Sequence, residues 1–417
     1  MHSPNRSDIN NRIQSIYFDN LYRNSFFIII TSITSGGLGF VFWMLAARIY
    51  PMEDVGVATA LISSMTLILV LSKMGFDVSI IRYFPDMDKN RALGTAIIVS
   101  SLFALFFSVI FIAGTDYWSP DLDLLVPLTG ILFIAIAITN VVLSLSGVAF
   151  TAVRKAKYYF FQNIVLGSRL LFLIPLACFG TLGLFGAYGA SSILTLLFTL
   201  AYLNTIGIKP TFCIDRSFIH ESFHFSVGNY ISNIFILAPN NLLPIIALYV
   251  LGAETTAQYF IVFTMVSILF TIPNALSTSL LVEGSNGVPL RESVIKSITT
   301  TYAVLIPVAT LFFIFGDSIL SFIGKDYSGN SVFFGTMILS SFLVSGLYIY
   351  SSILRIRRET REILYLTGLL FVLLTVSSYY LMQIYGLNGM GYAWILGYGA
   401  TIVVGGIRLL KKRTEQG

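Results

Sequence analysis

The sequence has 417 residues, of which 56% are hydrophobic and only 11% are charged, and its mean hydropathy is +0.84. Soluble domains carry about 25% charged residues, so this composition excludes a soluble globular protein. The net charge of +5 reflects the loops of a membrane protein and gives no indication of nucleic-acid binding. We therefore expect an all-α polytopic membrane protein.

Residues 1–25 are polar and lack the short apolar core and small-residue cleavage site of a signal peptide. We expect this segment to be an uncleaved cytoplasmic tail. Within it, Ile9, Ile13, Ile16 and Tyr17 share one face of a helix, which predicts a short interfacial helix at the membrane surface.

Apolar stretches of about 20 residues, the length needed to span a bilayer, recur along the whole chain. We predict twelve spans, at residues 26–47, 55–76, 92–114, 125–150, 160–180, 184–206, 227–251, 257–281, 297–316, 331–354, 363–385 and 389–410. The connections between them are short, and none is long enough for a soluble domain.

The charges of the loops predict the orientation. Loops on the same side as both termini carry 21 Lys and Arg residues, whereas the opposite loops carry only Arg48 and Lys325. Because cytoplasmic loops are enriched in Lys and Arg, both termini are expected in the cytoplasm, which requires an even number of spans. We expect a multi-pass protein of the cell (plasma or inner) membrane.

The chain also repeats itself weakly. The matched segments are 51–53 with 252–254, 183–186 with 386–389, and 154–155 with 357–358, at spacings of 201, 203 and 203 residues. A nearly constant spacing predicts two pseudo-symmetric six-helix lobes in the same orientation, related by an axis along the membrane normal. We expect an N lobe at 26–206, a cytoplasmic linker at 207–226, a C lobe at 227–410 and a cytoplasmic tail at 411–417.

Four basic residues near or within the spans are candidates for binding a substrate. Arg169 lies nine residues into the fifth span, about 14 Å deep at 1.5 Å per residue. A buried charge at that depth is costly and marks either an anion-binding cavity or an Arg held by backbone carbonyls. Lys73 either lines the cavity or simply pairs with Asp77, four residues on. Arg48 either snorkels to the interface or faces the substrate, and Arg82 is expected to anchor the second span.

The seventh span contains the clearest helix-breaking pattern. Pro239 and Pro244 flank Asn240-Asn241, and this arrangement predicts a broken helix with a gating role. Carboxylates deep in the spans are nearly absent, which disfavours a proton-coupled exporter of cations. The expected cavity is therefore cationic and suits a phosphate or pyrophosphate.

One segment has the spacing of a zinc-protease motif. His220-Glu221-Ser222-Phe223-His224 reads H-E-x-x-H, which would place two imidazoles on one helix face. A zinc site needs a third ligand, and neither His2 nor Glu254 is expected nearby. We interpret the segment as a solvated loop, predict no metal site, and keep an intramembrane zinc protease as an alternative. Nothing matches a nucleotide-binding loop, so no ATPase is expected.

Several short motifs together resemble one family. Arg48-x-x-Pro51-x-x-x-x-Gly56, then Gly75 and Arg82-Tyr83, resemble the opening of prokaryotic polysaccharide biosynthesis flippases. These belong to the multidrug/oligosaccharidyl-lipid/polysaccharide (MOP) exporter superfamily, with a MATE-like fold. The G-L-x-G segments before the sixth and twelfth spans are similar too, so the resemblance covers essentially the whole chain. It assigns roles to Arg48 and Arg82, whereas Lys73 and Arg169 are candidates from their depth alone.

The resemblance implies a transporter rather than an enzyme. Such proteins flip polyprenyl-(pyro)phosphate-linked oligosaccharides from the cytoplasmic to the outer leaflet by alternating access. The expected partners are that lipid-linked substrate, membrane lipids, and glycosyltransferases or a polymerase. No cofactor is expected; a coupling ion or the membrane potential drives the cycle. The alternative of the same fold is a cation-coupled exporter of drugs or organic cations.

Overall fold

The structure is a computed structural model that describes residues 20–118, 120–122, 127–285 and 289–416. Within these residues, eleven helices are long and apolar enough to cross a membrane. The expectation of an all-α multi-pass membrane protein is confirmed. The interfacial helix predicted around Ile9–Tyr17 lies outside the described residues.

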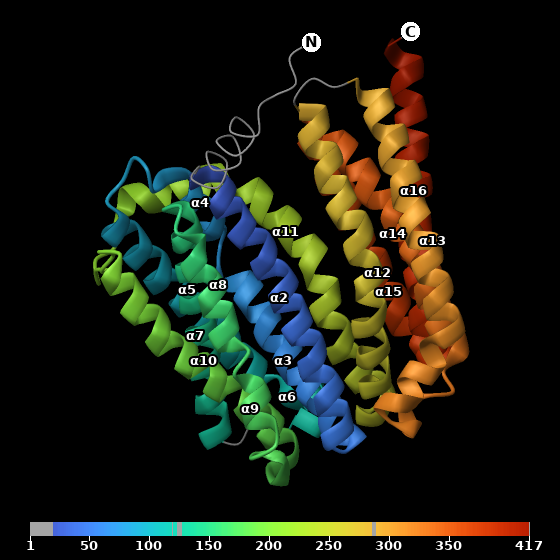
Figure 1. The fold of residues 1–417 in the computed structure, drawn as a ribbon, viewed down its shortest axis with the longest axis horizontal. Coiled ribbons are helices and arrows are strands. Elements are labelled where there is room, and N and C mark those ends of the chain that lie inside the picture. Colours follow the sequence, from blue (N-terminus) through green and yellow to red (C-terminus); the bar gives the residue numbers. More distant parts are fainter. Residues whose placement is uncertain (1–19, 119, 123–126, 286–288, 417) are drawn as a thin grey trace, which may run out of the picture.

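The helices follow one another with short connections (Figure 1). The first half contains α2 (Asn20–Ile49), α3 (Met52–Ser72), α4 (Phe76–Tyr83), α5 (Lys89–Ala113), α6 (Thr115–Trp118), the 3-10 turn η1 (Pro120–Leu122), α7 (Pro127–Ala152), α8 (Ala156–Leu166), α9 (Arg169–Leu173), the 3-10 turn η2 (Ala177–Phe179) and α10 (Gly180–Thr205). The second half contains α11 (Arg216–Leu251), α12 (Ala253–Ser285), α13 (Leu290–Ile323), the 3-10 turn η3 (Lys325–Tyr327), α14 (Ser331–Ile356), α15 (Thr360–Tyr385) and α16 (Leu387–Gln416).

Eleven of the twelve predicted spans are single helices, but the fifth, predicted at 160–180, is not. It is divided into α8 and α9, with η2 completing the crossing. The interruption lies at Gly167-Ser168, and Pro175 prevents α9 from continuing because it has no N–H to donate. A Cβ on Gly167 would lie 2.7 Å from Leu38 Cδ1, so glycine allows this break to lie directly against α2.

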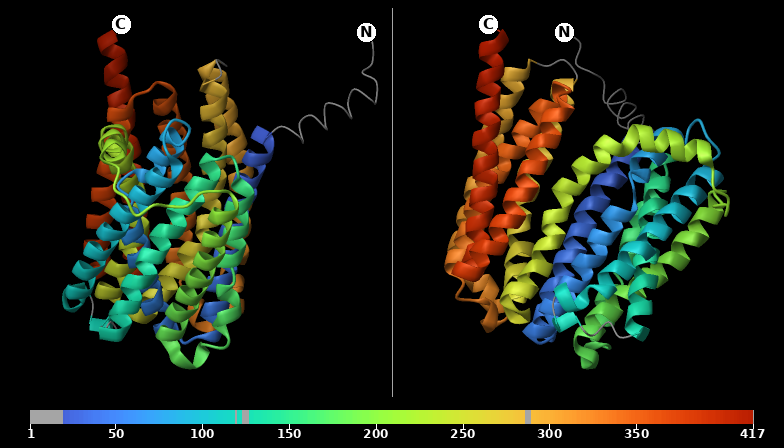
Figure 2. Two further views of the ribbon diagram at one scale, coloured as in Figure 1. Left: turned by 90° about the vertical axis from the view of Figure 1, so that its left-hand side faces the viewer. Right: turned by 180° about the vertical axis from the view of Figure 1, so that it is seen from behind.

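The helices form two lobes (Figures 1 and 2). The N lobe comprises α2 to α10 and the C lobe comprises α12 to α16. The first turn of α2 and the last turn of α16 lie at the same end of the bundle, which we call the terminal end; the opposite end is the far end. The ribbons of the two lobes diverge toward the terminal end and approach each other at the far end.

Contacts between the lobes at the far end are close. The Arg48 guanidinium of α2 lies 4.8 Å from the ring centre of Phe322 on α13. The tightest approach is between α3 and α12, where a Cβ on Gly56 would lie 1.9 Å from the carbonyl oxygen of Ala253. Only glycine fits at position 56 in this arrangement.

Helix α11 joins the two lobes. Near its start, Phe218 is buried in the N-lobe core and stacks on Phe76 at 5.7 Å. Near its end, Leu243 and Ala247 are buried in the cluster that the two lobes share. The helix therefore contributes to both hydrophobic cores and curves between them (Figure 2).

The predicted break in the seventh span is absent, because α11 is continuous through Pro239 and Pro244. Each proline removes one backbone donor, and packed membrane helices tolerate such losses by bending. Asn241 Nδ2 also donates to the carbonyl of Leu237 at 2.8 Å, which satisfies its amide locally. A gating role for Asn240 and its neighbours stays a prediction.

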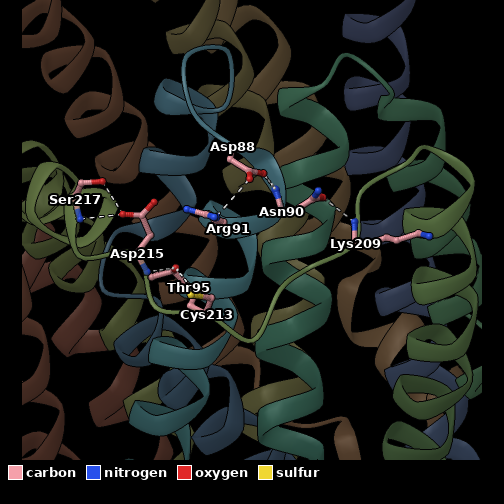
Figure 3. A network of polar contacts seen from close by, with 8 residues as sticks. All are labelled: Asp88, Asn90, Arg91, Thr95, Lys209, Cys213, Asp215 and Ser217. Carbon is pink, nitrogen blue, oxygen red and sulfur yellow. Dashed lines mark hydrogen bonds and ion pairs between the residues drawn. The ribbon is translucent and has the colours of Figure 1, made fainter.

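A short extended segment before α11 is attached to the N lobe, as Figure 3 shows. The N–H of Lys209 donates to Asn90 Oδ1 at 2.8 Å, and the N–H of Asp215 donates to Thr95 Oγ1 at 2.9 Å. Thr95 in turn donates to the carbonyl of Cys213 at 3.1 Å. Residues 207–215 thus lie across the start of α5, whereas residues 216–226 of the predicted linker already belong to α11.

The two halves end their fourth and tenth spans in the same way. Arg154 and Arg358 have positive φ values of 57° and 59°. In each case the N–H of the next residue donates to the carbonyl five residues earlier. The N–H of Lys155 donates to Phe150 at 2.8 Å, and the N–H of Glu359 donates to Leu354 at 2.9 Å. These are Schellman-type caps, and they pair the halves at a spacing of 204 rather than 203.

The glycine repeat has a different register from the predicted one. Gly180 and Gly386 both have positive φ, 55° and 58°. Added Cβ atoms on Gly183 and Gly389 would each lie 2.0 Å from a backbone carbonyl oxygen of the preceding segment. Gly183 therefore corresponds to Gly389, at a spacing of 206, and its predicted pairing with Gly386 is wrong. The fifth crossing is broken into α8, α9 and η2, whereas its counterpart α15 is one continuous helix, so the two segments differ in length.

Replacing Gly56 should force the far end apart. In Gly56→Val, the branched side chain would collide with the backbone of Ala253, and overpacking of this kind costs about 1–3 kcal/mol or more. The distance between spin labels at Tyr117→Cys and Val332→Cys, on a background with Cys178 and Cys213 replaced by Ser, should lengthen. Gly37→Val is the control, since nothing lies within 4 Å of its Cβ position. An unchanged distance in Gly56→Val would contradict the close approach.

The cap of α11 should make stability depend on pH. Hydrogen bonds from the Ser217 hydroxyl and the Phe218 N–H hold the pKa of Asp215 below its usual 3.8. A lowered pKa means that the carboxylate stabilises the fold fully above about 3.8 and loses this effect as pH falls through the folded-state pKa. Asp215→Ala should cost about 0.5–2 kcal/mol at pH 7.

Thermal unfolding of the purified protein between pH 7 and pH 3 measures this effect. Asp215→Asn should keep most of the stability at pH 7 and lose the acid dependence that Asp215 contributes. Asp86→Ala removes an exposed carboxylate from the same end of the bundle and serves as the control. Equal unfolding midpoints for Asp215→Ala and Asp86→Ala would show that the cap does not stabilise α11.

Candidate functional site

The break in the fifth crossing determines where Arg169 lies. The N–H of Ser168 donates to the carbonyl of Val165, and the N–H of Leu170 donates to that of Gly167, at 2.9 and 3.1 Å. These bonds form a tight turn, and α9 begins at Arg169 immediately after it. Arg169 is thus the first residue of α9, and its guanidinium lies against α2.

The guanidinium of Arg169 lies against the middle of α2. Its Cζ is 4.9 Å from the ring centre of Phe42, which is fully buried, and its Nη2 is 3.4 Å from the position of a Cβ on Gly39. The Nε is buried without a hydrogen-bond partner. Among the described residues, no carboxylate pairs with it. That Arg169 lies near the middle of the membrane stays a prediction.

Uncharged polar side chains adjoin this guanidinium. Tyr188 of α10 is close enough to interact electrostatically with Arg169. One turn further along α10, the Ser192 hydroxyl donates to Asn140 Oδ1 at 3.3 Å, and Asn140 Nδ2 is buried without a partner. Arg169, Tyr188, Asn140 and Ser192, which we call the N-lobe polar cluster, come from the fifth, sixth and fourth spans. The cluster combines one fixed positive charge with neutral donors.

Sequence reasoning placed Arg169 by its depth but missed what surrounds it. Phe42 and Tyr188 have no sequence signal, because aromatic residues are frequent in all spans and their contact with Arg169 depends on tertiary packing. Gly39 of α2 lies beside the guanidinium. In the structure, its missing side chain leaves room for the guanidinium.

Arg48 and Arg169 are far apart. Arg48 is exposed at the far end, over Phe322 of the other lobe. Gly39, next to the Arg169 guanidinium, precedes Arg48 by nine residues, or about 14 Å of helical rise. The structure therefore does not bring these two candidates together.

Lys73 lies closer to the terminal end, at the break between α3 and α4. Its Nζ pairs with Asp77 Oδ2 at 3.1 Å, and both side chains are 18% exposed. Tyr230 of α11 donates its hydroxyl to the carbonyl of Leu71 at 2.5 Å, beside this break. The predicted pairing of Lys73 with Asp77 is thus present. Arg82 is exposed at the end of α4.

The H-E-x-x-H segment lies in the first turns of α11. His220 shares a small surface pocket with Arg216 and Phe223, and Glu221 is exposed. The side chain of His224 lies outside the described residues. Within the part of the chain that the structure describes, no three His, Cys, Asp or Glu side chains are grouped so that they could hold a metal ion.

Known proteins share both the sequence pattern and the fold. A model of the polysaccharide biosynthesis protein family matches residues 21–282. No curated protein matches the sequence.

Three solved structures of transport proteins are similar to this chain. An inward-facing multidrug resistance MATE family transporter of the MOP superfamily has a TM-score of 0.70 and 15% identity, covering 92% of this chain and 96% of that one. The outward-facing conformation of such a transporter gives 0.64 at 14% identity, with 93% of each chain covered. The lipid II flippase MurJ, in an inward closed conformation, gives 0.64 at 15% identity, covering 90% and 87%.

At these identities the structures establish the fold, and the family match covers more than half of the chain. The chain therefore belongs to the polysaccharide biosynthesis protein family and has the MATE-like fold of the MOP superfamily.

Proposed function

We propose that this protein flips a polyprenyl-(pyro)phosphate-linked oligosaccharide across the cell membrane for surface polysaccharide biosynthesis. The observation that carries the proposal is the half-buried Arg169 side chain, whose Nε is buried without a hydrogen-bond partner and which has no carboxylate partner among the described residues. A guanidinium presents donors in a fork that matches phosphate oxygens. Family membership and a fold shared with a lipid II flippase support the same substrate class.

The direction of transport follows from the proposed orientation. The excess of Lys and Arg in the loops at the terminal end indicates that this end faces the cytoplasm. With the lobes in contact at the far end, the protein would receive its substrate from the cytoplasmic leaflet. Separation of the far-end contacts would then release the oligosaccharide outside, while the polyprenyl tail stays in the bilayer.

The three candidate cations would meet the phosphate in turn. Lys73 lies nearest the terminal end, Arg169 at mid-span and Arg48 at the far end. Of these three cations, Arg169 would pair with the phosphate at the depth in the membrane where an unpaired charge has the highest free energy. Glycosyltransferases would supply the lipid-linked substrate at the cytoplasmic face.

Removing the Arg169 charge should abolish most transport. Charged hydrogen bonds contribute about 1.5–3 kcal/mol, so Arg169→Ala should weaken export and binding of a polyprenyl-pyrophosphate oligosaccharide roughly 10- to 100-fold. Arg169→Lys should recover only part of the loss, because a single ammonium lacks the fork. Flipping in proteoliposomes and surface glycan in cells are the measurements.

Two comparisons make the Arg169 result interpretable. Arg291→Ala removes an exposed positive charge at the terminal end and should export normally. The size-exclusion elution profile and the thermal unfolding of the Arg169→Ala protein establish whether this variant folds. A folded Arg169→Ala protein that exports at the normal rate would overturn the cationic part of the proposal. Resistance to organic cations on expression, without glycan export, would favour the multidrug exporter instead.

The role of Lys73 can be separated from that of its partner. Asp77→Asn should leave export intact, because it frees the ammonium group for the substrate. Lys73→Gln should lower export severalfold. If the pair serves only to hold α3 and α4 together, a surface pair of this kind is worth about 0.2–1 kcal/mol and both variants would export alike. Initial flipping rates at low substrate concentration distinguish these outcomes.

A further inference from the structure

A second cationic site lies at the terminal end of the N lobe. A cavity of about 540 Å³ is formed by the loop before α5, the end of α7 and the segment after α10. Its lining includes Lys89 and Asn90 of α5, Lys155 after α7, and Gly207 and Ile208. Cavities of 300–1,000 Å³ are of the size that binds small molecules.

The cavity has a net positive charge. Lys89 and Lys155 are exposed, and neither pairs with a carboxylate among the described residues. Asp88 also lines the cavity, but its carboxylate accepts from the N–H of Asn90 at 2.9 Å and lies 3.7 Å from Arg91 Nε (Figure 3). Two ammonium groups are therefore available to an anion.

The corresponding place in the C lobe is different. At the spacing of 204 residues established by the helix caps, Glu359 takes the place of Lys155. The cavity there is lined by Arg358, Glu359, Thr360, Arg361 and Glu362, and Glu362 accepts two bonds from Arg408 at 2.8 and 2.9 Å. Mixed charges make that cavity less suited to an anion, so the N-lobe cavity is not a general feature of the fold's repeat.

We propose that the N-lobe cavity binds the phosphodiester headgroup of an anionic phospholipid. The position of the cavity along the membrane normal favours this ligand. Its lining residues lie at or just beyond the ends of three membrane-crossing helices, which is where lipid headgroups lie. Basic cavities between helices on the cytoplasmic side recognise such headgroups. The cavity adjoins the end of α10, and on the preceding turns of that helix Leu197 and Leu200 are 63% and 47% exposed, as lipid-facing side chains are.

The bound lipid would connect three loops that belong to the N lobe. Asn90 holds the N–H of Lys209, so the cavity adjoins the extended segment that leads into α11. A headgroup in the cavity therefore stabilises the attachment of α11 to the N lobe. The site is separate from Arg169, and its occupancy does not depend on the proposed glycan substrate.

Lipid titrations followed by native mass spectrometry test the proposal on the full-length protein. Phosphatidylglycerol should bind more tightly than phosphatidylcholine, which carries no net charge. Lys89→Gln with Lys155→Gln should weaken phosphatidylglycerol binding roughly 30-fold, the effect expected for two basic groups at a membrane surface. The matched control, Lys157→Gln with Lys209→Gln, removes equal charge outside the cavity and should change binding less than about twofold.

Three results would overturn the assignment. Equal binding of phosphatidylglycerol by the wild type and the double variant would show that the cavity is not the site. Equal affinity for phosphatidylcholine would exclude recognition by charge. Displacement of the lipid by inorganic phosphate at the same phosphorus concentration would identify free phosphate as the ligand. Glycan export does not enter any of these measurements, so they stand apart from the proposed function.

Discussion

The structure depends on how one positive charge is kept inside an apolar bundle. A guanidinium at mid-span is costly unless it is solvated, paired or bound to a ligand. Here the ring of Phe42 covers one face of the Arg169 group, and Tyr188 provides a dipole nearby. Neither neutralises the charge. The anion site proposed for Arg169 would supply the missing negative charge, next to the break in the fifth crossing.

Much of this arrangement was predictable from the sequence. Hydropathy gave the positions of eleven helices, because each apolar run is long enough to span a bilayer. The fifth crossing was the exception, since Gly167-Ser168 interrupts the helix without interrupting the apolar run. In α11 the opposite holds: Pro239 and Pro244 suggested a break, but packing against both lobes keeps the helix continuous. Hydropathy reports burial and does not report backbone continuity.

The candidate site was predictable only in part. Depth along an apolar run identified Arg169, and a separation of four residues identified the pair of Lys73 with Asp77, because both depend only on neighbours in the sequence. The neighbours of Arg169 come from α2, α7 and α10, so no local pattern contains them. The repeat illustrates the same limit: its existence was visible in the sequence, whereas its register required the caps at Arg154 and Arg358.

The shape of α11 has a mechanical consequence. Its first turns are fixed in one hydrophobic core by Phe218 and its last turns in another by Leu243, so any relative rotation of the lobes strains the helix between them. Pro239 and Pro244 lie in or beside that stretch, and each leaves one carbonyl without its usual partner. Fewer bonds there oppose flexing. The helix is therefore easiest to bend near these prolines.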